Sequence, residues 1–224
     1  KKIRHILEFI FLKSLFLIIN RFPHRALFWT SATIGYLMFK IPSVKKITTS
    51  NVQASFRNKS KEEVKRIACS SLSNLVQNLF EFVWFSGEAK RQEKHLSISV
   101  QTNEPAKEKT RNGKGLIFVA PHIGNWELAG LMSTSISGLP FAAVAKKLDN
   151  PYLDKLIIQK RSAEGTRIIP SNGAVRGMIR ALAKGSAVAT LIDQNIRARD
   201  GGIWVEFFGL PVSSSRAPAM LARR

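Results

Sequence analysis

The sequence predicts an α/β protein with a mostly parallel central sheet flanked by helices, preceded by an N-terminal helical hairpin that associates with a membrane. From residue 113 onward, short apolar runs alternate with helical stretches, a pattern typical of a parallel sheet. Before residue 42, two apolar stretches lie among basic side chains. We therefore expect a membrane-associating segment at residues 1–42 and an α/β domain at residues 43–224.

The expected hairpin consists of apolar stretches from Ile6 to Ile19 and from Ala26 to Phe39. Each is shorter than the roughly 20 apolar residues of a spanning helix, and Pro23 separates them. Residues 1–50 carry nine basic side chains and one acidic side chain. Basic and apolar residues together favour an interfacial position on an anionic membrane. Two ordinary core helices remain the alternative.

An amphipathic helix is expected after residue 60. Ser60 and Glu63 have the spacing of a capping box, and apolar positions then recur at helical spacing as far as Phe80. The single cysteine, Cys69, lies in this helix, and we assign it no chemistry. One cysteine excludes an internal disulfide and a cysteine-rich metal centre.

The second half of the chain supplies the elements of the sheet. Glycines mark the changes between them, as expected of loop residues. The chain begins without Met and ends in an expected helix with no stop signal, so we expect a fragment with a truncated C-terminus. The expected strands are 116–120, 141–145, 167–169 and 187–192, and the expected helices lie near 125–136, 150–163 and 173–184.

Residues that can carry chemistry occur where the first of these strands gives way to a helix. His122 follows the strand, and Glu127 falls in the first helical turn after Asn125, an expected N-cap. A short turn through Gly124 can fold the carboxylate back toward the imidazole and lets a substrate approach closely, so we expect Gly124 and Asn125 to bind substrate. Such a pair acts as a general base toward a hydroxyl group. The alternative is a capping histidine beside an acid favoured by the helix dipole.

Other classes of chemistry lack their sequence signals. His122 and Glu127 have no companion His or Cys nearby, so we predict no metal, and we expect no cofactor. The chain contains no G-x-S-x-G elbow, no Walker loop and no spaced dinucleotide glycines. Direct group transfer, without a covalent serine intermediate, is the chemistry that remains.

The segment His122-Ile-Gly-Asn-Trp-Glu127 resembles the H-x₄-[D/E] motif of the lipid A biosynthesis acyltransferases, the family that includes enzymes of the Kdo2-lipid A lauroyl and myristoyl acyltransferase type. The resemblance covers roughly residues 25–222 and is carried by several blocks in the family's order. These blocks are Asn51 with Phe56, Glu81 to Trp84, Asn150 to Asp154, Arg161 with Gly165, the Gly173 to Gly185 helix, Asp193 to Asn195 and Phe207 to Pro211.

This resemblance implies a fold like that of the glycerolipid acyltransferases. It also implies transfer of a fatty acyl chain from acyl carrier protein to a hydroxyl of a lipid A precursor, a late acylation step of lipopolysaccharide biosynthesis, at the inner membrane with the site facing the cytoplasm. By the same analogy His122 is the general base and Glu127 orients and charge-balances it. Arg161 is a positive group for the oxyanion or a lipid phosphate, and Asp193 and Gln194 line the same crevice.

Two segments depart from the family pattern. Residues 164–167 read Glu-Gly-Thr-Arg, which mimics a phosphate-binding motif of the glycerolipid branch. We interpret it as a coincidental match, but we retain Arg167 as a candidate phosphate contact. Residues 213–216 read Ser-Ser-Ser-Arg where the family usually has Thr-rich residues, which puts acceptor or tail contacts there in doubt.

The net charge of +20 predicts anionic partners, and an acidic carrier protein, a phosphorylated acceptor and an anionic leaflet all qualify. Nucleic acid is disfavoured because aromatic residues are scarce in the basic stretch 151–206. Alternatives remain open: acyl transfer to another membrane glycolipid such as a mannoside or an ornithine lipid, a CoA-dependent glycerolipid enzyme, an inactive relative, or a non-enzymatic protein that binds anionic membranes or nucleic acid.

Overall fold

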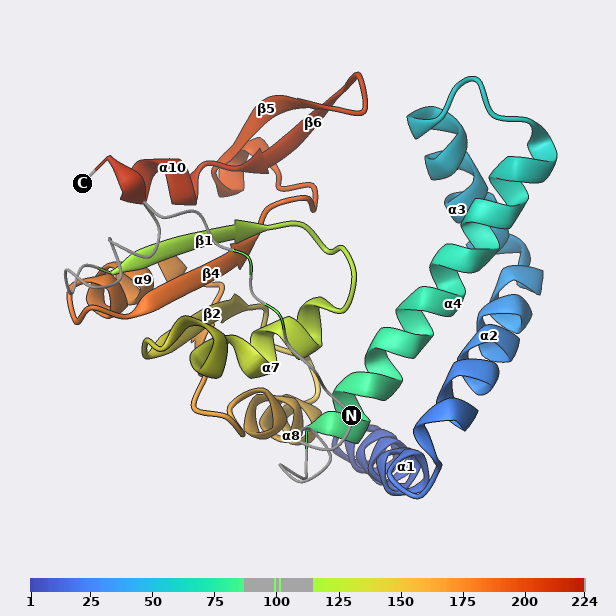
Figure 1. Ribbon diagram of the computed structural model, residues 1–224, viewed down its shortest axis with the longest axis horizontal. Helices are drawn as coiled ribbons and strands as arrows, with labels where there is room; N and C mark the ends of the chain where they lie inside the picture. The colour runs from blue at the N-terminus through green and yellow to red at the C-terminus, as the bar shows by residue number, and fades with distance from the viewer. Residues whose placement is uncertain (87–98, 100, 102–114, 224) are drawn as a thin grey trace. The chain divides into compact units, whose positions relative to one another are not determined.

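The computed structural model describes residues 1–86, 99, 101 and 115–223 (Figure 1). The chain divides into two compact units. One unit comprises Lys1–Ser14, Phe85–Ile203 and Ser213–Arg224, and the other comprises Leu15–Trp84 and Trp204–Val212. The functional boundary expected between residues 42 and 43 stays a prediction.

A four-stranded parallel sheet forms the centre of the first unit. Its strands are β1 (Leu116–Ala120), β2 (Phe141–Ala145), β3 (Arg167–Pro170) and β4 (Ala187–Leu191), and their order in the sheet is β1-β4-β2-β3. Every pairing in this sheet is parallel. The strands predicted from the apolar runs are therefore confirmed to within one residue at each end. In the described residues, β1 and β4, far apart in sequence, are direct neighbours.

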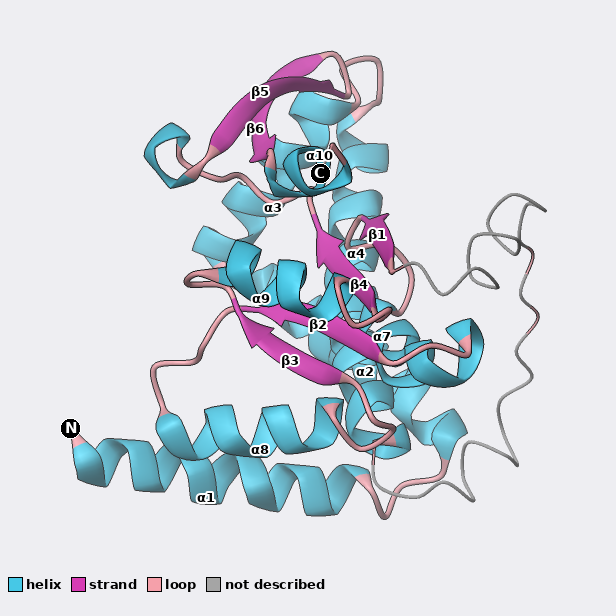
Figure 2. Cartoon of the chain, turned by 90° about the vertical axis from the view of Figure 1, so that its left-hand side faces the viewer, coloured by secondary structure: helices cyan, strands magenta, loops and turns pink. Residues whose placement is uncertain are grey.

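Helices cover the two faces of this sheet, as Figure 2 shows. α7 (Trp126–Ser137) contacts β2, α8 (Pro151–Arg161) contacts β3, and these two helices contact each other. α9 (Ala174–Leu182) contacts β2, β3 and β4, while α10 (Ala217–Ala222) contacts β1 and α9. The mixed α/β class with a parallel sheet is confirmed. The core under α9 and α10 is built by the buried residues Ala142, Ile169, Met178, Ala181, Val188 and Leu221.

Two further strands, β5 (Gly202–Phe207) and β6 (Leu210–Ser215), form a separate two-stranded sheet. A short 3₁₀ turn, Ala198–Asp200, precedes it. Phe208 (φ 53°) and Gly209 (φ 65°), which join the strands, both have left-handed backbone conformations. This connection is the Phe-Phe-Gly block noted in the sequence.

The first part of the chain is helical: α1 (Lys2–Ile19), α2 (His24–Lys40), α3 (Pro42–Ser55) and α4 (Lys61–Phe85). Both apolar stretches of the expected hairpin lie in helices, α1 and α2. Among the described residues, no helix combines the length and the apolar character needed to cross a membrane. The membrane association of this segment stays a prediction.

The start of α4 confirms the predicted capping box. The Ser60 backbone N–H donates to Glu63 Oε2 at 3.0 Å, and the Glu63 backbone N–H donates to Ser60 Oγ at 3.2 Å. Lys59 Nζ also donates to Glu63 Oε1 at 2.8 Å. Hydrogen bonds from the Lys59 side chain, and then from Ser60, lower the pKa of Glu63 to about 2.

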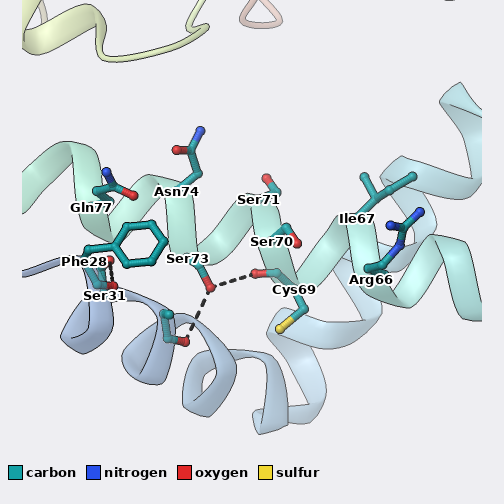
Figure 3. Close-up of a pocket in the computed structure, with 11 residues that line it drawn as sticks. Phe28, Ser31, Arg66, Ile67, Cys69, Ser70, Ser71, Ser73, Asn74 and Gln77 are labelled. Atoms are coloured by element: carbon teal, nitrogen blue, oxygen red, sulfur yellow. Dashed lines mark hydrogen bonds between the residues drawn. The ribbon is translucent and has the colours of Figure 1, made fainter.

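Helices α2 and α4 approach closely within the second unit. A Cβ placed on Gly35 would lie 2.4 Å from the Cα of Ser73, so any larger residue would push the helices apart. The Ser73 hydroxyl is within 3.4 Å of the Ala32 carbonyl and 3.2 Å of the Cys69 carbonyl (Figure 3). An open groove of about 800 Å³ runs along these two helices, and none of the predicted site residues lines it.

Candidate active site

Strand register places His122 beside Asp193. β1 and β4 are parallel neighbours in which Ala120 pairs with Leu191, so the second residue after each strand lies at the same level. The Ile192 backbone N–H donates to the Ala120 carbonyl at 3.2 Å, which continues the ladder past the last paired residues. Both chains leave the sheet at its carboxyl edge, where parallel α/β sheets bind their ligands.

The two side chains form a tight pair. His122 Nδ1 lies 2.6 Å from Asp193 Oδ1, and the His122 backbone N–H donates to Asp193 Oδ2 at 2.8 Å. The carboxylate thereby fixes both the main chain and the ring of one residue. It favours the tautomer with a proton on Nδ1, which leaves Nε2 as the basic nitrogen. The side chains of His122 and Asp193 are 24% and 20% exposed, so a ligand can reach them.

The electrostatics of Asp193 agree with this arrangement. Partial burial acts to raise the pKa of its carboxyl group, but hydrogen bonds from the His122 ring and from backbone N–H groups outweigh that effect and hold the pKa below its usual value. Asp193 is therefore ionised at neutral pH, and its charge can stabilise an imidazolium on His122.

Two neighbours complete the surroundings of the imidazole. The Gln194 side-chain amide Nε2 lies 3.2 Å from His122 Nε2, and it donates to that nitrogen in the tautomer set by Asp193. The ring of Trp126 meets the imidazole edge to face at 5.2 Å between centroids, with an interplanar angle of 73°. The prediction that Asp193 and Gln194 share a crevice with His122 agrees with this geometry.

The turn between β1 and α7 has the features expected from the sequence. Gly124 has a φ of 58°, a left-handed conformation that favours glycine. Asn125 is the N-cap of α7, and its Oδ1 accepts the Leu128 backbone N–H at 3.0 Å. These two residues shape the turn that carries His122 away from the sheet.

The placement of Glu127 differs from the prediction. We expected its carboxylate to fold back to His122, but it forms a two-pronged pair with Arg161, whose Nε donates to Oε2 at 2.9 Å and whose Nη2 donates to Oε1. The reason is geometric: α7 and α8 pack together, and the guanidinium fork matches a carboxylate in two places. The carboxylate on the imidazole is Asp193. Arg161, expected as a positive group for an oxyanion or phosphate, is committed to Glu127.

Arg167 is not brought to this site. Arg167 is the first residue of β3, and β3 and β1 are the two outer strands of the sheet. Arg167 therefore lies at the amino end of its strand, whereas His122 lies at the carboxyl edge of the sheet. The preceding residue, Thr166, is buried, and its hydroxyl donates to the Gly130 carbonyl at 3.1 Å. The Glu-Gly-Thr-Arg segment therefore connects the start of β3 to α7 through the Thr166 hydroxyl, which is a structural role.

Sequence reasoning placed Asp193 in the crevice but missed its direct contact with His122. The available signal was a shared position, because each residue follows an expected apolar strand within two positions. What was lacking was the order of the strands, since only adjacency of β1 and β4 turns equal positions into a contact. Conversely, His122 and Glu127 lie close in sequence, which suggested a contact between them. Packing of α7 against α8 pairs Glu127 with Arg161 instead.

A parallel α/β sheet with a hydrogen-bonded histidine and carboxylate at its carboxyl edge defines a protein equipped for acid–base chemistry on a bound ligand. Family comparison makes this more specific. The sequence profile described as bacterial lipid A biosynthesis acyltransferase matches residues 1–224, and the chain belongs to that family. The resemblance inferred from the motifs is confirmed.

Curated relatives support the same assignment. The chain is 28% identical over 114 residues to a phosphatidylinositol mannoside acyltransferase of Mycolicibacterium smegmatis, covering 49% of this chain and 36% of that protein. It is 31% identical over 113 residues to a phosphatidylinositol mannoside acyltransferase of Mycobacterium tuberculosis, covering 49% of this chain and 35% of that protein. The matched stretch thus spans about a third of the length of these relatives.

Proposed function

We propose that this protein is an acyltransferase that moves a fatty acyl chain from a thioester donor to a hydroxyl group of a membrane glycolipid. The observation that carries the proposal is the His122–Asp193 pair at the carboxyl edge of the sheet. Membership of the lipid A biosynthesis acyltransferase family supports the reaction class. The names of the two mycobacterial relatives support a glycolipid acceptor.

The proposed chemistry is a direct transfer. His122 Nε2 accepts the proton of the acceptor hydroxyl as its oxygen attacks the thioester carbonyl. A carbon–oxygen bond forms, the carbon–sulfur bond breaks, and the thiolate leaves with the proton returned by the imidazolium. Asp193 stabilises that imidazolium, and the Gln194 amide moves aside to admit the hydroxyl. General-base help of this kind contributes about 10²- to 10⁴-fold to the rate.

The donor we propose is acyl carrier protein, and the acceptor is a lipid A precursor. The net charge of +20 supports both, because an acidic carrier and a phosphorylated lipid are anionic. The family description supports the lipid A acceptor. A mannoside lipid is the second candidate acceptor, because the two mycobacterial relatives carry that substrate in their names.

We further propose that the protein works at the cytoplasmic face of the inner membrane. Large apolar side chains are exposed on both N-terminal helices, for example Ile3 on α1 (75%) and Trp29 on α2 (72%). Basic residues lie close to them along the chain. Exposed apolar and basic side chains on a helix favour an anionic lipid surface.

The test is acyl transfer from labelled acyl carrier protein to a tetra-acylated lipid A precursor and, in parallel, to a phosphatidylinositol mannoside. His122→Ala should lower the rate by about 10²- to 10⁴-fold with the fold intact by circular dichroism. His24→Ala, which removes a histidine from α2, is the matched control and should stay within about threefold of the unmodified protein. Full activity in His122→Ala, or no transfer to either acceptor by the unmodified protein, would contradict the proposal. Competition with acyl-CoA identifies the donor.

A further inference from the structure

The first half of α1 has two unlike faces. Ile3, Leu7, Ile10 and Phe11 recur at helical spacing, and each is between 54% and 75% exposed. His5, on the other side, is buried. A surface helix of a water-soluble protein normally turns its apolar face toward the core and its polar face toward the solvent, whereas here the apolar face is exposed. With Lys2, Arg4 and Lys13 in the same helix and Lys1 directly before it, this face is complementary to an anionic lipid surface.

The inner face of α1 docks on the start of α8, and Figure 2 shows the two helices side by side. Asn150 makes the connection. Its Nδ2 donates to the His5 carbonyl at 2.8 Å and to Glu8 Oε2 at 2.9 Å. The rings of Phe9 and Tyr152 add an aromatic contact, with centroids 5.9 Å apart. These groups all belong to the unit that contains the sheet.

Both ends of the Asn150 amide are in use. While Nδ2 donates to α1, Oδ1 accepts the backbone N–H groups of Tyr152 (3.0 Å) and Leu153 (3.4 Å) as the N-cap of α8. The residue is only 5% exposed. Aspartate could cap the helix equally well but has no N–H to donate, and it would face Glu8 with a like charge. Capping alone does not require an asparagine here, whereas the bond to α1 does.

The far end of α8 reaches the candidate active site. Arg161, the last residue of α8, forms an ion pair with Glu127 in the first turn of α7. Glu127 follows His122 by five positions in the sequence. Lys160 Nζ donates to Ser86 Oγ at 3.1 Å, and burial lowers the pKa of that lysine. An 11-residue helix about 16 Å long thus connects the docked face of α1 with the turn that carries the general base.

We propose that Asn150 is a positioning residue that fixes the lipid-facing helix α1 to α8 and thereby holds the catalytic turn at a set distance from the lipid surface. The inference rests on the proposed transfer to a membrane acceptor. It assigns a use to the Asn-Pro-x-x-Asp block, which the catalytic residues leave unexplained. Transfer to an acceptor in a bilayer needs this connection, whereas transfer to a dispersed acceptor does not.

The test compares Asn150→Asp with the exchange variant Asn150→Asp/Glu8→Gln on the full chain. Asn150→Asp keeps the cap but loses the donor. The exchange variant restores a hydrogen bond in the reverse direction, from the glutamine amide to the aspartate. Glu8→Gln alone is the control, because its amide oxygen still accepts from Asn150. Three quantities are measured: hydrogen exchange of residues 2–14, binding to phosphatidylglycerol vesicles, and transfer to a vesicle-embedded and to a detergent-dispersed acceptor.

Asn150→Asp should weaken exchange protection of residues 2–14 by about tenfold or more, because a hydrogen bond to a charged group is lost. The ratio of vesicle to dispersed activity should fall by a similar factor, while vesicle binding stays because the apolar face is unchanged. The exchange variant should recover part of both quantities, because it restores the bond to residue 8 but not the bond to the His5 carbonyl. A cap or folding defect would lower both activities equally and would not respond to residue 8.

Unchanged protection in Asn150→Asp would overturn the proposal, as would an equal fall in both activities or a failure of Glu8→Gln to rescue. Absence of vesicle binding by the unmodified protein would overturn the lipid-facing assignment of α1. Absence of acyl transfer with normal vesicle binding would instead contradict the proposed function, and the exchange measurement would still decide whether Asn150 holds α1.

Discussion

Two carboxylates near the sheet edge have different partners and different surroundings. Asp193 follows β4 and bonds to the ring and the backbone of His122, and its side chain is 20% exposed. Glu127 is the second residue of α7 and pairs with the guanidinium of Arg161, and its side chain is 13% exposed. Strand register makes the first pair, and helix packing makes the second.

The sequence motif from His122 to Glu127 suggested that a single carboxylate supports the imidazole. The structure instead divides the roles between Asp193 and Glu127. In the proposed transfer, the carboxylate on His122 sets the tautomer and stabilises a positive ring, and so acts in the reaction itself. The carboxylate on Arg161 joins α7 to the neighbouring helix α8, and α7 directly follows the turn that bears His122. Loss of the first carboxylate should change the chemistry, and loss of the second should mainly change stability and position.

The largest expected effect concerns the turnover number. Asp193→Asn should lower kcat by about 10²- to 10⁴-fold, because the amide cannot hold the imidazole in its basic tautomer or balance its charge. Glu127→Gln should lower kcat less, by about tenfold, because the imidazole keeps its carboxylate. The measurement is steady-state transfer with both variants under one set of conditions. The opposite ranking would show that Glu127, rather than Asp193, supports His122 during the reaction.

A smaller effect is expected on stability. Glu127→Gln and Arg161→Met should each lower the free energy of unfolding by about 1–3 kcal/mol, between the values for exposed and for buried ion pairs. The double variant should lose less than the sum of the two, with a coupling of about 1 kcal/mol. Urea unfolding of the four proteins measures this. Additive losses would show that the pair does not tie α7 to α8.

The smallest effect concerns acid stability. The folded pKa of Asp193 lies below its usual 3.8, so the stabilisation from its pair is complete above that value and is lost as the pH falls through the folded pKa. The unmodified protein should therefore lose stability more steeply below about pH 4 than Asp193→Asn does. Urea midpoints from pH 5 to pH 3 compare the two. Parallel curves would mean that Asp193 gains no stabilisation from His122.

Features that depend on neighbours in the chain were predictable. The capping box at Ser60 and Glu63, the N-cap at Asn125 and the four strands follow from side chains within a few residues of each other. The placement of His122 after a strand belongs to the same class. Features that depend on distant segments were not predictable, and the pairing of Glu127 with Arg161, 34 positions away, is the clearest case.

The sequence by itself determined the elements, their order and the family motif, because helix caps and apolar periods act over one or two turns. Only the tertiary structure decided which elements touch. It set β4 beside β1, and so gave His122 the carboxylate of Asp193. It packed α8 against α7, and so took Glu127 away from the imidazole. The physical reason is that strand order and helix packing are settled by burial of the whole apolar surface, which no local pattern encodes.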